Sequence, residues 1–391
     1  MSANADTIVF PFLGAELGGS HISAFTLGQE LVRRFNKRCV VIAPEGSRIG
    51  REASDRGFEI LVSGERPIMR NSPLFDVTRL LPRIGVLRRA GPGALVHCND
   101  IGALQSWGVA AKCLRLPVIY HHRALNRMIL PNRIVLKLAD AVICISAQVR
   151  RSLAAARLAR VSTVLNPFAV SLAFDRTAAR ADLVGRHSFE EDAFIVGFIG
   201  NFWARKRPFF FLDACRRILQ KNPKARFVLF GRNGEIGESQ LLEHARKLGI
   251  AGRTTFAGFQ LPIEKNIAAL DLLLAPAIAE PFGRTLIEAV LLGTPYVATD
   301  DAGHSEIALQ WNGGFLVEPA ASEVQFADAA LAVAGRASAV VLPPPLRRSV
   351  AEEFSAEMHA RKVMKIYDEV ADDRRLILNR SSRPWRWKTS D

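Results

Sequence analysis

Residues 272–295 read LLLAPAIAEPFGRTLIEAVLLGTP, and this stretch decides the fold that we expect for the chain. Its opening apolar run is typical of a short buried strand, and apolar residues at helical spacing predict a helix from about Gly283 to Leu292. Pro281 and Gly283 let the backbone turn close to a ligand at the helix start, where free N–H groups and the helix dipole attract a phosphate. The stretch therefore predicts a strand, a tight turn and a helix that can bind an anion.

Two carboxylates flank the predicted turn. Glu280 stands before the helix and Glu288 lies within it, so the two carboxylates can face different parts of a ligand. Acidic residues at a helix start are often merely solvated, because the helix dipole favours negative charge there. An isolated pair of this kind does not define a site, and its interpretation depends on the rest of the chain.

Further glycine-containing segments accompany this stretch in the same half of the chain. They are GNFWARKRP at 200–208, FGRNG at 230–234, TFAGF at 255–259, GTPYVAT at 293–299, GHSE at 303–306 and GFLVEP at 314–319. In this order, and together with the two Glu residues, they resemble the motifs of glycosyltransferase family 4. The resemblance covers nearly the whole chain and is strongest between residues 195 and 320.

Strand patterns alternate with helical patterns along both halves of the chain, which indicates two parallel, doubly wound sheets. Strands are expected near 8–12, 39–43, 58–62, 94–98, 118–121, 141–145 and 161–165, and then near 194–199, 226–230, 254–256, 272–275 and 296–298. The resemblance implies an α/β protein of the GT-B fold, in which two Rossmann-like, doubly wound parallel-sheet domains face a cleft. We expect an N-terminal acceptor-side domain over 1–172, a nucleotide-sugar-binding domain over 173–350, a helix over 351–371 that packs back on the first domain, and a basic Trp-containing tail over 372–391.

The resemblance also implies a reaction. The family transfers a sugar from a nucleotide diphosphate sugar to an acceptor hydroxyl, retains the anomeric configuration and needs no divalent metal. The expected donor substrate is a UDP-, GDP- or ADP-sugar, with no cofactor and no metal site. Because the leaving diphosphate develops negative charge, fixed cations and N–H donors are required around it. Lys206 lies at the family's Lys position and is implied for this task, whereas Glu280 is implied to hold the donor sugar and Glu288 the ribose.

One position departs from the family pattern. The Arg that follows the first glycine of the 200–208 segment in the family is Asn201 here, and Arg205 or Arg207 are the candidates to replace it. The family has no agreed covalent nucleophile, and none is assigned. The donor-binding positions implied in this half of the chain are Gly200, Arg205, Gly231, Phe282, Gly283 and Glu288, with backbone amides of Phe282 and Gly283 acting at the helix start.

The N-terminal half contributes a second glycine loop. The segment Gly14 to Ser20 resembles the family's Gly-Gly loop, which implies that the amides of Gly18 and Gly19 approach the donor diphosphate. A lone glycine loop after a first strand is weak support for this role, because it can equally be a tight strand-to-helix turn.

Histidines follow two of the N-terminal strands. The family has a His at the end of the strand near 118–121 that contacts the donor sugar and the reacting centre, and His121 or His122 is expected there in preference to His97. Lone His residues at strand ends are more often structural, so the choice between the two stays open. The candidate catalytic residues are Lys206, Glu280, His121 and His122.

The net charge of +14 is concentrated in the N-terminal part. Residues 1–172 carry 23 Lys and Arg against 11 Asp and Glu, which predicts an anionic partner, either membrane lipid or nucleic acid, or else only a solvated Arg-rich surface. No nucleic-acid-binding motif accompanies the charge, so nucleic acid is not expected as a partner. Residues 72–90, with Arg79, Arg83, Arg88 and Arg89, and the tail with Trp385 and Trp387, are the candidates for contact with an anionic bilayer.

Other features point to the cytoplasm. The five Cys are scattered without metal-ligand spacing and read as reduced thiols, and neither a signal peptide nor a membrane-spanning run is recognisable. We therefore expect a cytoplasmic enzyme, peripheral on the inner face of the plasma membrane, that adds sugars to bacterial surface polysaccharide or a lipid-linked glycan. The alternative is a catalytically silent sugar-nucleotide-binding or scaffolding protein of the same fold.

Overall fold

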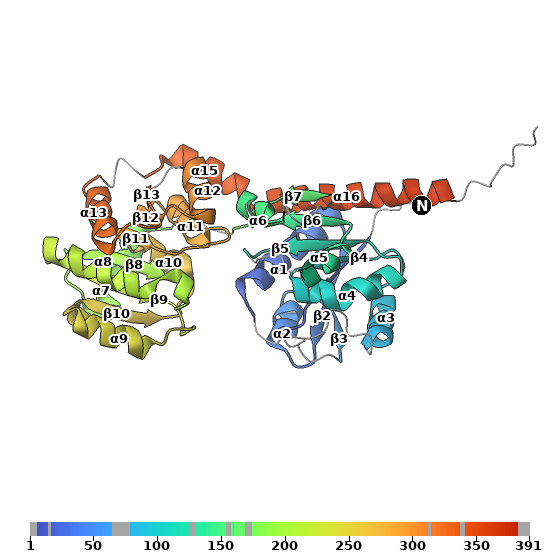
Figure 1. Ribbon diagram of the computed structural model, residues 1–391, viewed down its shortest axis with the longest axis horizontal. Coiled ribbons are helices and arrows are strands. Elements are labelled where there is room, and N and C mark those ends of the chain that lie inside the picture. The colour runs from blue at the N-terminus through green and yellow to red at the C-terminus, as the bar shows by residue number, and fades with distance from the viewer. Residues whose placement is uncertain are drawn as a thin grey trace, which may run out of the picture. The chain divides into compact units, whose positions relative to one another are not determined.

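The computed structural model describes residues 6–14, 17–64, 79–125, 130–153, 158, 160–168, 174–311, 314–336 and 341–381, with only the backbone described from 374 onward. The contacts divide the chain into two units (Figure 1). Unit 1 comprises Met1–Pro167 together with Phe354–Asp391, and unit 2 comprises Phe168–Glu353. The tail residues Trp385 and Trp387 and the first part of the 72–90 segment lie outside the described residues.

Unit 1 is built on a seven-stranded parallel sheet in the order β3-β2-β1-β4-β5-β6-β7. The strands are β1 Thr7–Pro11, β2 Arg38–Pro44, β3 Glu59–Ser63, β4 Leu95–Cys98, β5 Val118–His122, β6 Ala141–Cys144 and β7 Val161–Thr163. The helices are α1 Gly19–Phe35, α2 Arg48–Asp55, α3 Leu80–Arg89, α4 Ile101–Cys113, α5 Leu130–Leu136, α6 Ala147–Ser152 and α16 Ala356–Ser381. The strand order reverses between β1 and β4, and ligands of such sheets bind outside the carboxyl ends of the strands at this switch point.

The last helix, α16, is far from unit 1 in sequence but belongs to its core. Figure 1 shows α16, in red, alongside the blue and green elements of unit 1. Val363, Ile366 and Val370 of α16 are buried in the same apolar cluster as Ile8 and Phe25. The helix begins later and extends further than the predicted 351–371.

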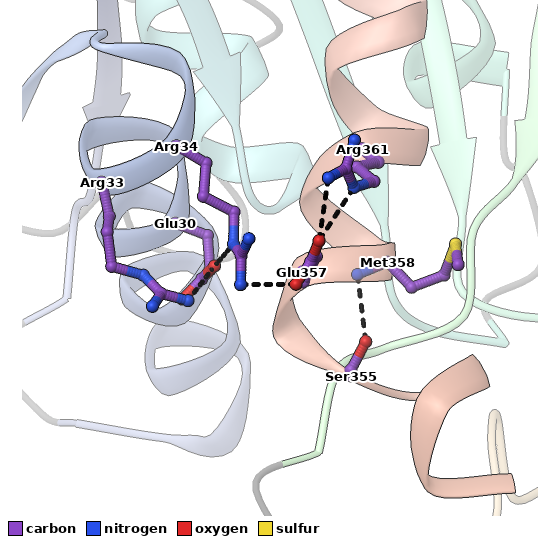
Figure 2. Close-up of polar contacts among 7 residues, drawn as sticks. All are labelled: Glu30, Arg33, Arg34, Ser355, Glu357, Met358 and Arg361. Carbon is purple, nitrogen blue, oxygen red and sulfur yellow. Dashed lines mark hydrogen bonds and ion pairs between the residues drawn. The ribbon is translucent and has the colours of Figure 1, made fainter. Parts of the chain in front are cut away.

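An ion pair on the surface joins α16 to α1, and further pairs within each helix surround it. Figure 2 shows Glu357 of α16 between two arginines: it pairs with Arg34 of α1 and accepts a hydrogen bond from Arg361 Nη2 at 2.9 Å. Arg34 also pairs with Glu30 through Nε at 2.7 Å. At the start of α16, Ser355 Oγ accepts from the amide of Met358 at 3.1 Å and so caps the helix. These contacts fix both the position and the first turn of α16.

Unit 2 repeats the architecture with six parallel strands in the order β10-β9-β8-β11-β12-β13. The strands are β8 Phe194–Ile199, β9 Ala225–Phe230, β10 Thr254–Gly258, β11 Leu272–Ala275, β12 Tyr296–Thr299 and β13 Gly314–Val317. The helices are α7 Arg176–His187, α8 Pro208–Lys221, α9 Glu238–Lys247, α10 Ile263–Ala268, α11 Arg284–Leu292, α12 Ala302–Gln310, α13 Glu323–Ala334 and α15 Pro344–Glu353, with short 3₁₀ turns at Ala204–Lys206 and Ala251–Arg253. The switch point of this sheet lies between β8 and β11.

The predicted pair of parallel, doubly wound sheets is therefore confirmed. Strands such as β2 and β11 are apolar and buried along most of their length, as expected for sheets covered by helices on both faces. Strand β13 was not among the expected strands. No helix in the described part of the chain is long and apolar enough to cross a membrane.

Candidate active site

The carboxyl edge of the unit 2 sheet is where most of the predicted site residues lie. Gly200 follows β8 and Gly231 follows β9, and their loops cross in close contact. A Cβ built on Gly231 would lie 2.1 Å from the carbonyl oxygen of Gly200, so a larger residue at 231 would push the two loops apart. Gly200 has a φ of 152°, which favours glycine. Both glycines are therefore required by the backbone that forms this edge.

Asn201, which stands where the family has an Arg, is part of the same crossing. Its Oδ1 accepts a hydrogen bond from the amide of Arg232 at 3.1 Å, and the amide of Phe202 donates to the carbonyl of Arg232 at 2.9 Å. Asn201 thus fastens the two loops to each other and supplies no positive charge.

Two cations lie on the 3₁₀ turn Ala204–Lys206. Arg205 Nη1 lies 2.6 Å and Lys206 Nζ 2.7 Å from the same oxygen, Oε2, of Glu280. The amide of Ile278 donates to the carbonyl of Arg205 at 2.9 Å and holds the turn against the loop that carries Glu280. Arg207, the other candidate, stacks its guanidinium 3.7 Å above the ring of Phe210 instead. Of the two candidates, Arg205 is therefore the one that reaches Glu280.

The three side chains of this cluster differ in exposure. The Glu280 side chain is 12% exposed and that of Lys206 16%, whereas Arg205 remains 43% exposed. Burial by itself would raise the pKa of Glu280, but the charges of Lys206 and then Arg205 outweigh it and lower this pKa to about 2. Glu280 is consequently ionised at any physiological pH, and the cluster carries one net positive charge.

The loop from Glu280 to Gly283 is held by the segment that follows β12. The amide of Gly303 donates to the carbonyl of Glu280 at 2.8 Å, and a Cβ at Gly303 would lie 2.6 Å from the backbone of Phe282. Asp301 Oδ2 accepts from the amide of Ala279 at 2.5 Å. Asp301 is therefore a support for the Glu280 loop, a role that sequence reasoning missed.

His304 also packs against this loop, since a Cβ on Gly283 would lie 3.2 Å from His304 Cδ2. It is 1% exposed, and burial lowers its pKa to about 4 although the charge of Glu280 opposes this. Its GHSE segment is one of those that resemble the family's motifs, but no role was predicted for His304 itself.

The predicted helix over 283–292 is α11, which begins at Arg284 after Gly283 in the left-handed region, with a φ of 79°. Phe282 stacks on Phe168 with ring centres 5.6 Å apart. Glu288 is 1% exposed, and its Oε1 accepts from Arg284 Nε at 2.8 Å. Burial raises the pKa of Glu288, and Arg284 partly opposes this. The carboxylate of Glu288 is therefore buried and bound by Arg284, within the helix that follows the loop.

In unit 1, Gly18 and Gly19 lie at the start of α1. The amide of Gly18 donates to Nδ1 of His21 at 3.0 Å, so this amide already has a partner within its own turn. A Cβ at Gly19 would meet no atom within 4 Å, so space does not require glycine there. These two residues lie in unit 1, whereas Lys206 and Glu280 lie in unit 2.

His121 and His122 end β5, where alternation turns the two side chains to opposite faces of the sheet. On one face, His122 Nδ1 contacts the hydroxyl of Tyr120 at 2.8 Å, and burial lowers the pKa of His122 to about 4. On the other face, His121 Nδ1 contacts His97 Nε2 at 3.2 Å and Arg123 Nη2 at 3.1 Å. His97 thus takes part in the same cluster as His121, although sequence reasoning ranked it last.

Residues 79–90, the described part of the segment expected to contact an anionic bilayer, expose only some of its basic side chains. Helix α3 exposes Leu81, Arg88 and Arg89, with Leu81 78% exposed. Arg83, in contrast, is 3% exposed because α3 packs on α4. Of the four arginines named as candidates for contact with an anionic bilayer, Arg83 is therefore too buried to make it.

The chain is similar to known glycosyltransferases in sequence. Two family models match the chain, one described as Glycosyltransferase Family 4 over residues 17–172 and one described as Glycosyl transferases group 1 over residues 180–334. The chain is 31% identical over 133 residues to the putative glycosyltransferase EpsD of Bacillus subtilis, a match that covers 34% of each chain. It is 30% identical over 204 residues to the lipopolysaccharide core biosynthesis mannosyltransferase LpsB of Rhizobium meliloti, covering 50% of this chain and 56% of that one. The matched part is less than two thirds of either relative.

Solved structures agree in fold over a longer stretch. Anabaena Alr3699/HepE in complex with UDP superposes with a TM-score of 0.78 at 20% identity, covering 93% of this chain and 100% of that one. A glycosyltransferase from Rickettsia africae superposes with a TM-score of 0.78 at 16% identity, covering 94% and 99%. At this level of identity the likeness concerns the fold alone, and it confirms the predicted GT-B fold.

Proposed function

The chain belongs to the group 1 glycosyltransferases of the family 4 type, and we propose that it transfers a sugar from a nucleotide diphosphate sugar to an acceptor hydroxyl with retention at the anomeric carbon. The observation that carries this proposal is the cluster of Arg205, Lys206 and Glu280 at the carboxyl edge of the unit 2 sheet. It offers two cations for a diphosphate and one carboxylate for sugar hydroxyls, at the edge where sheets of this type bind ligands.

The electrostatics of the cluster suit a leaving diphosphate. Breaking the anomeric C–O bond places negative charge on the phosphate oxygens, and preorganised cations stabilise that charge best when they are partly shielded from water. Lys206 is partly shielded from water in this way. Arg205 is more exposed, so its side chain can change rotamer and move from Glu280 to a phosphate. In this scheme the leaving phosphate takes the proton of the acceptor hydroxyl, so that no protein nucleophile is needed.

The scheme needs neither a cofactor nor a divalent metal, because Lys206 and Arg205 supply the positive charge. The donor is a UDP-, GDP- or ADP-sugar. HepE, of the same fold, has been crystallised with UDP and glucose. LpsB is described as acting in lipopolysaccharide core biosynthesis. On these grounds we propose a glycan or lipid-linked acceptor in bacterial surface polysaccharide synthesis.

A donor screen with the purified protein tests the function. We expect one of the UDP-, GDP- or ADP-sugars to raise the melting temperature, because a ligand at 100 times its Kd adds about 2.7 kcal/mol to stability. The same donor should be hydrolysed slowly to the nucleoside diphosphate, and EDTA should leave this hydrolysis unchanged. A donor that binds without hydrolysis would favour the catalytically silent alternative, and no stabilisation by any donor would contradict the proposal.

We further propose that unit 1 docks on an anionic bilayer that carries the acceptor, through the exposed Leu81, Arg88 and Arg89 of α3. Each Arg near such a surface contributes about 1 kcal/mol, so replacing Arg88 and Arg89 by Gln should lower binding to anionic liposomes roughly 10-fold to 30-fold at low salt. Co-sedimentation measures this effect.

The matched control replaces Arg150 and Arg151, which are also exposed and lie on α6 of the same unit. This change removes the same charge and should leave liposome binding almost unchanged. Equal losses in the two double variants would reduce the effect to net charge, and no binding of the unaltered protein to anionic liposomes would favour a soluble acceptor.

A further inference from the structure

A cluster of polar side chains is buried at the carboxyl ends of β4 and β5, beneath α16. His97, His121 and His359 are all at most 2% exposed, as is Tyr367. Tyr367 contacts His97 Nδ1 through its hydroxyl at 2.6 Å, and His97 Nε2 lies 3.2 Å from His121 Nδ1. Two of the four members, His359 and Tyr367, come from the last helix of the chain.

Arg123 determines the direction of the hydrogen bond between His97 and His121. A guanidinium can only donate, so His121 Nδ1, at 3.1 Å from Arg123 Nη2, must be an acceptor without a proton. His97 can then contact the same Nδ1 only by donating from its own Nε2–H. If His97 is neutral, its Nδ1 is an acceptor, and the hydroxyl of Tyr367 must donate to it.

Neutral histidines are favoured here. Burial lowers the pKa of His97 and of His121 well below the ordinary value, and the charge of Arg123 lowers both further. His359 on α16 and His122 add to this effect on His121. Arg123 is itself fixed, because its Nε donates to Asn99 Oδ1 at 2.7 Å and its Nη1 donates to Asn166.

The bonds thus run in one direction, from the Tyr367 hydroxyl to His97 and from His97 to His121. With Nδ1 occupied as an acceptor, neutral His121 carries its proton on Nε2. This Nε2 is buried and has no hydrogen-bond partner within the described part of the chain. A buried N–H without a partner costs free energy, so a hydroxyl or phosphate oxygen that reached it would gain a ready-made donor.

We infer that Tyr367 and His97 are positioning residues that hold His121 as a permanently neutral Nε2–H donor for an oxygen of the substrate. The inference deepens the proposed function and rests on it for the identity of that oxygen. It excludes His121 as a general acid or base, since protonation of Nδ1 would break its bonds to His97 and Arg123. It also distinguishes His121 from His122, whose Nδ1 contacts Tyr120 and whose Nε2 lies 3.5 Å from Ser152 Oγ.

The role of α16 follows from this arrangement. The helix brings Tyr367 to a histidine 270 residues away in sequence, and His359 stacks on His121 with ring centres 5.9 Å apart. His359 Nδ1 donates to the carbonyl of Leu165 at 2.7 Å, which orients the ring that covers His121. The ion pair between Glu357 and Arg34 (Figure 2) holds the first turn of α16 in the position that this stacking requires.

The proton positions can be measured without any substrate. In the protein labelled with ¹⁵N-histidine, long-range proton–nitrogen spectra distinguish a protonated from an unprotonated ring nitrogen, and a His121→Gln variant assigns the signals. We expect His121 to be the neutral Nε2–H form throughout about pH 5 to 8, where an ordinary histidine titrates. A protonated Nδ1 or a titration of His121 in that range would overturn the inference, even if the protein proves to be a glycosyltransferase.

Tyr367→Phe tests the link to catalysis. The change removes the donor to His97 Nδ1, so that this nitrogen can take up a proton. We expect kcat for transfer to fall about 10-fold, the scale of one lost hydrogen bond, and to fall further toward acidic pH as His97 becomes charged. The Kd for the nucleoside diphosphate should not change, because its proposed site lies in unit 2.

Tyr120→Phe is the matched control. Tyr120 is as buried as Tyr367 and also contacts a histidine Nδ1, that of His122 on the other face of β5. It should leave the pH profile of kcat and the ¹⁵N signals of His121 unchanged. Equal effects of the two variants on the pH profile and on these signals would reduce the role of Tyr367 to packing. If Tyr367→Phe fails to fold, the spectra of the unaltered protein still decide the tautomer of His121.

Discussion

Replacing Lys206 by Ala is expected to lower turnover by about 100-fold or more while the protein stays folded. The expectation follows from the position of Nζ, which is largely shielded from water and is one of two cations in a cluster with a single carboxylate. Removing one preorganised donor from a site that stabilises a developing anion usually has an effect of this size. The measurement is kcat for transfer, or for donor hydrolysis, with the melting temperature as the check on folding.

The control for this variant is Lys265→Ala. Lys265 lies in the same unit and pairs with Asp182 at 3.0 Å, away from the cluster. It should retain nearly full turnover. If Lys206→Ala also turns over normally, the positive charge that acts on the diphosphate must come from Arg205, and an Arg205→Ala variant should then show the loss instead.

The fold was predictable from the sequence because its strands are buried on both faces. Runs such as residues 40–43 and 272–275 are apolar without interruption, which is the pattern of a strand in a covered parallel sheet. Strand β13, Gly314–Val317, escaped prediction because only its last residue is buried. Arg83 was misjudged because an amphipathic pattern does not reveal which face of a short helix a neighbouring helix covers.

The site was predictable as a set of positions but not as a set of contacts. The motifs indicated Lys206 and Glu280 separately, yet nothing in the sequence shows that they meet through one carboxylate oxygen. The replacement of the family's Arg by Asn201 suggested a missing cation. The structure shows instead that Asn201 ties two loops together. The bond between His97 and Tyr367 joins residues too distant in sequence for any periodicity to relate them.

The two glutamates should respond differently when each is changed to Gln. Glu280 faces Lys206 and Arg205 in the empty site, so a diphosphate that binds these cations must compete with its carboxylate. Glu280→Gln removes this competitor, and we expect affinity for UDP or GDP to be retained or increased. Transfer should nevertheless fall by about 100-fold, because the proposed contact of Glu280 is to the sugar, which neither nucleotide carries.

Glu288→Gln should weaken the binding of the free nucleotide, because its proposed partner is the ribose. Its carboxylate is buried and bound by Arg284, so a ribose can reach it only when the half-exposed Arg284 side chain moves aside. Gln keeps the shape of Glu but accepts from Arg284 and from ribose hydroxyls with a neutral oxygen, which makes each bond weaker. Calorimetry with UDP and GDP at pH 7 measures the nucleotide affinity of both variants. At this pH Glu280 is ionised in the unaltered protein, because its pKa is lowered to about 2, so Glu280→Gln removes a full negative charge. Equal losses of nucleotide affinity in both variants would contradict the division of roles, and a loss confined to Glu280→Gln would exchange the two assignments.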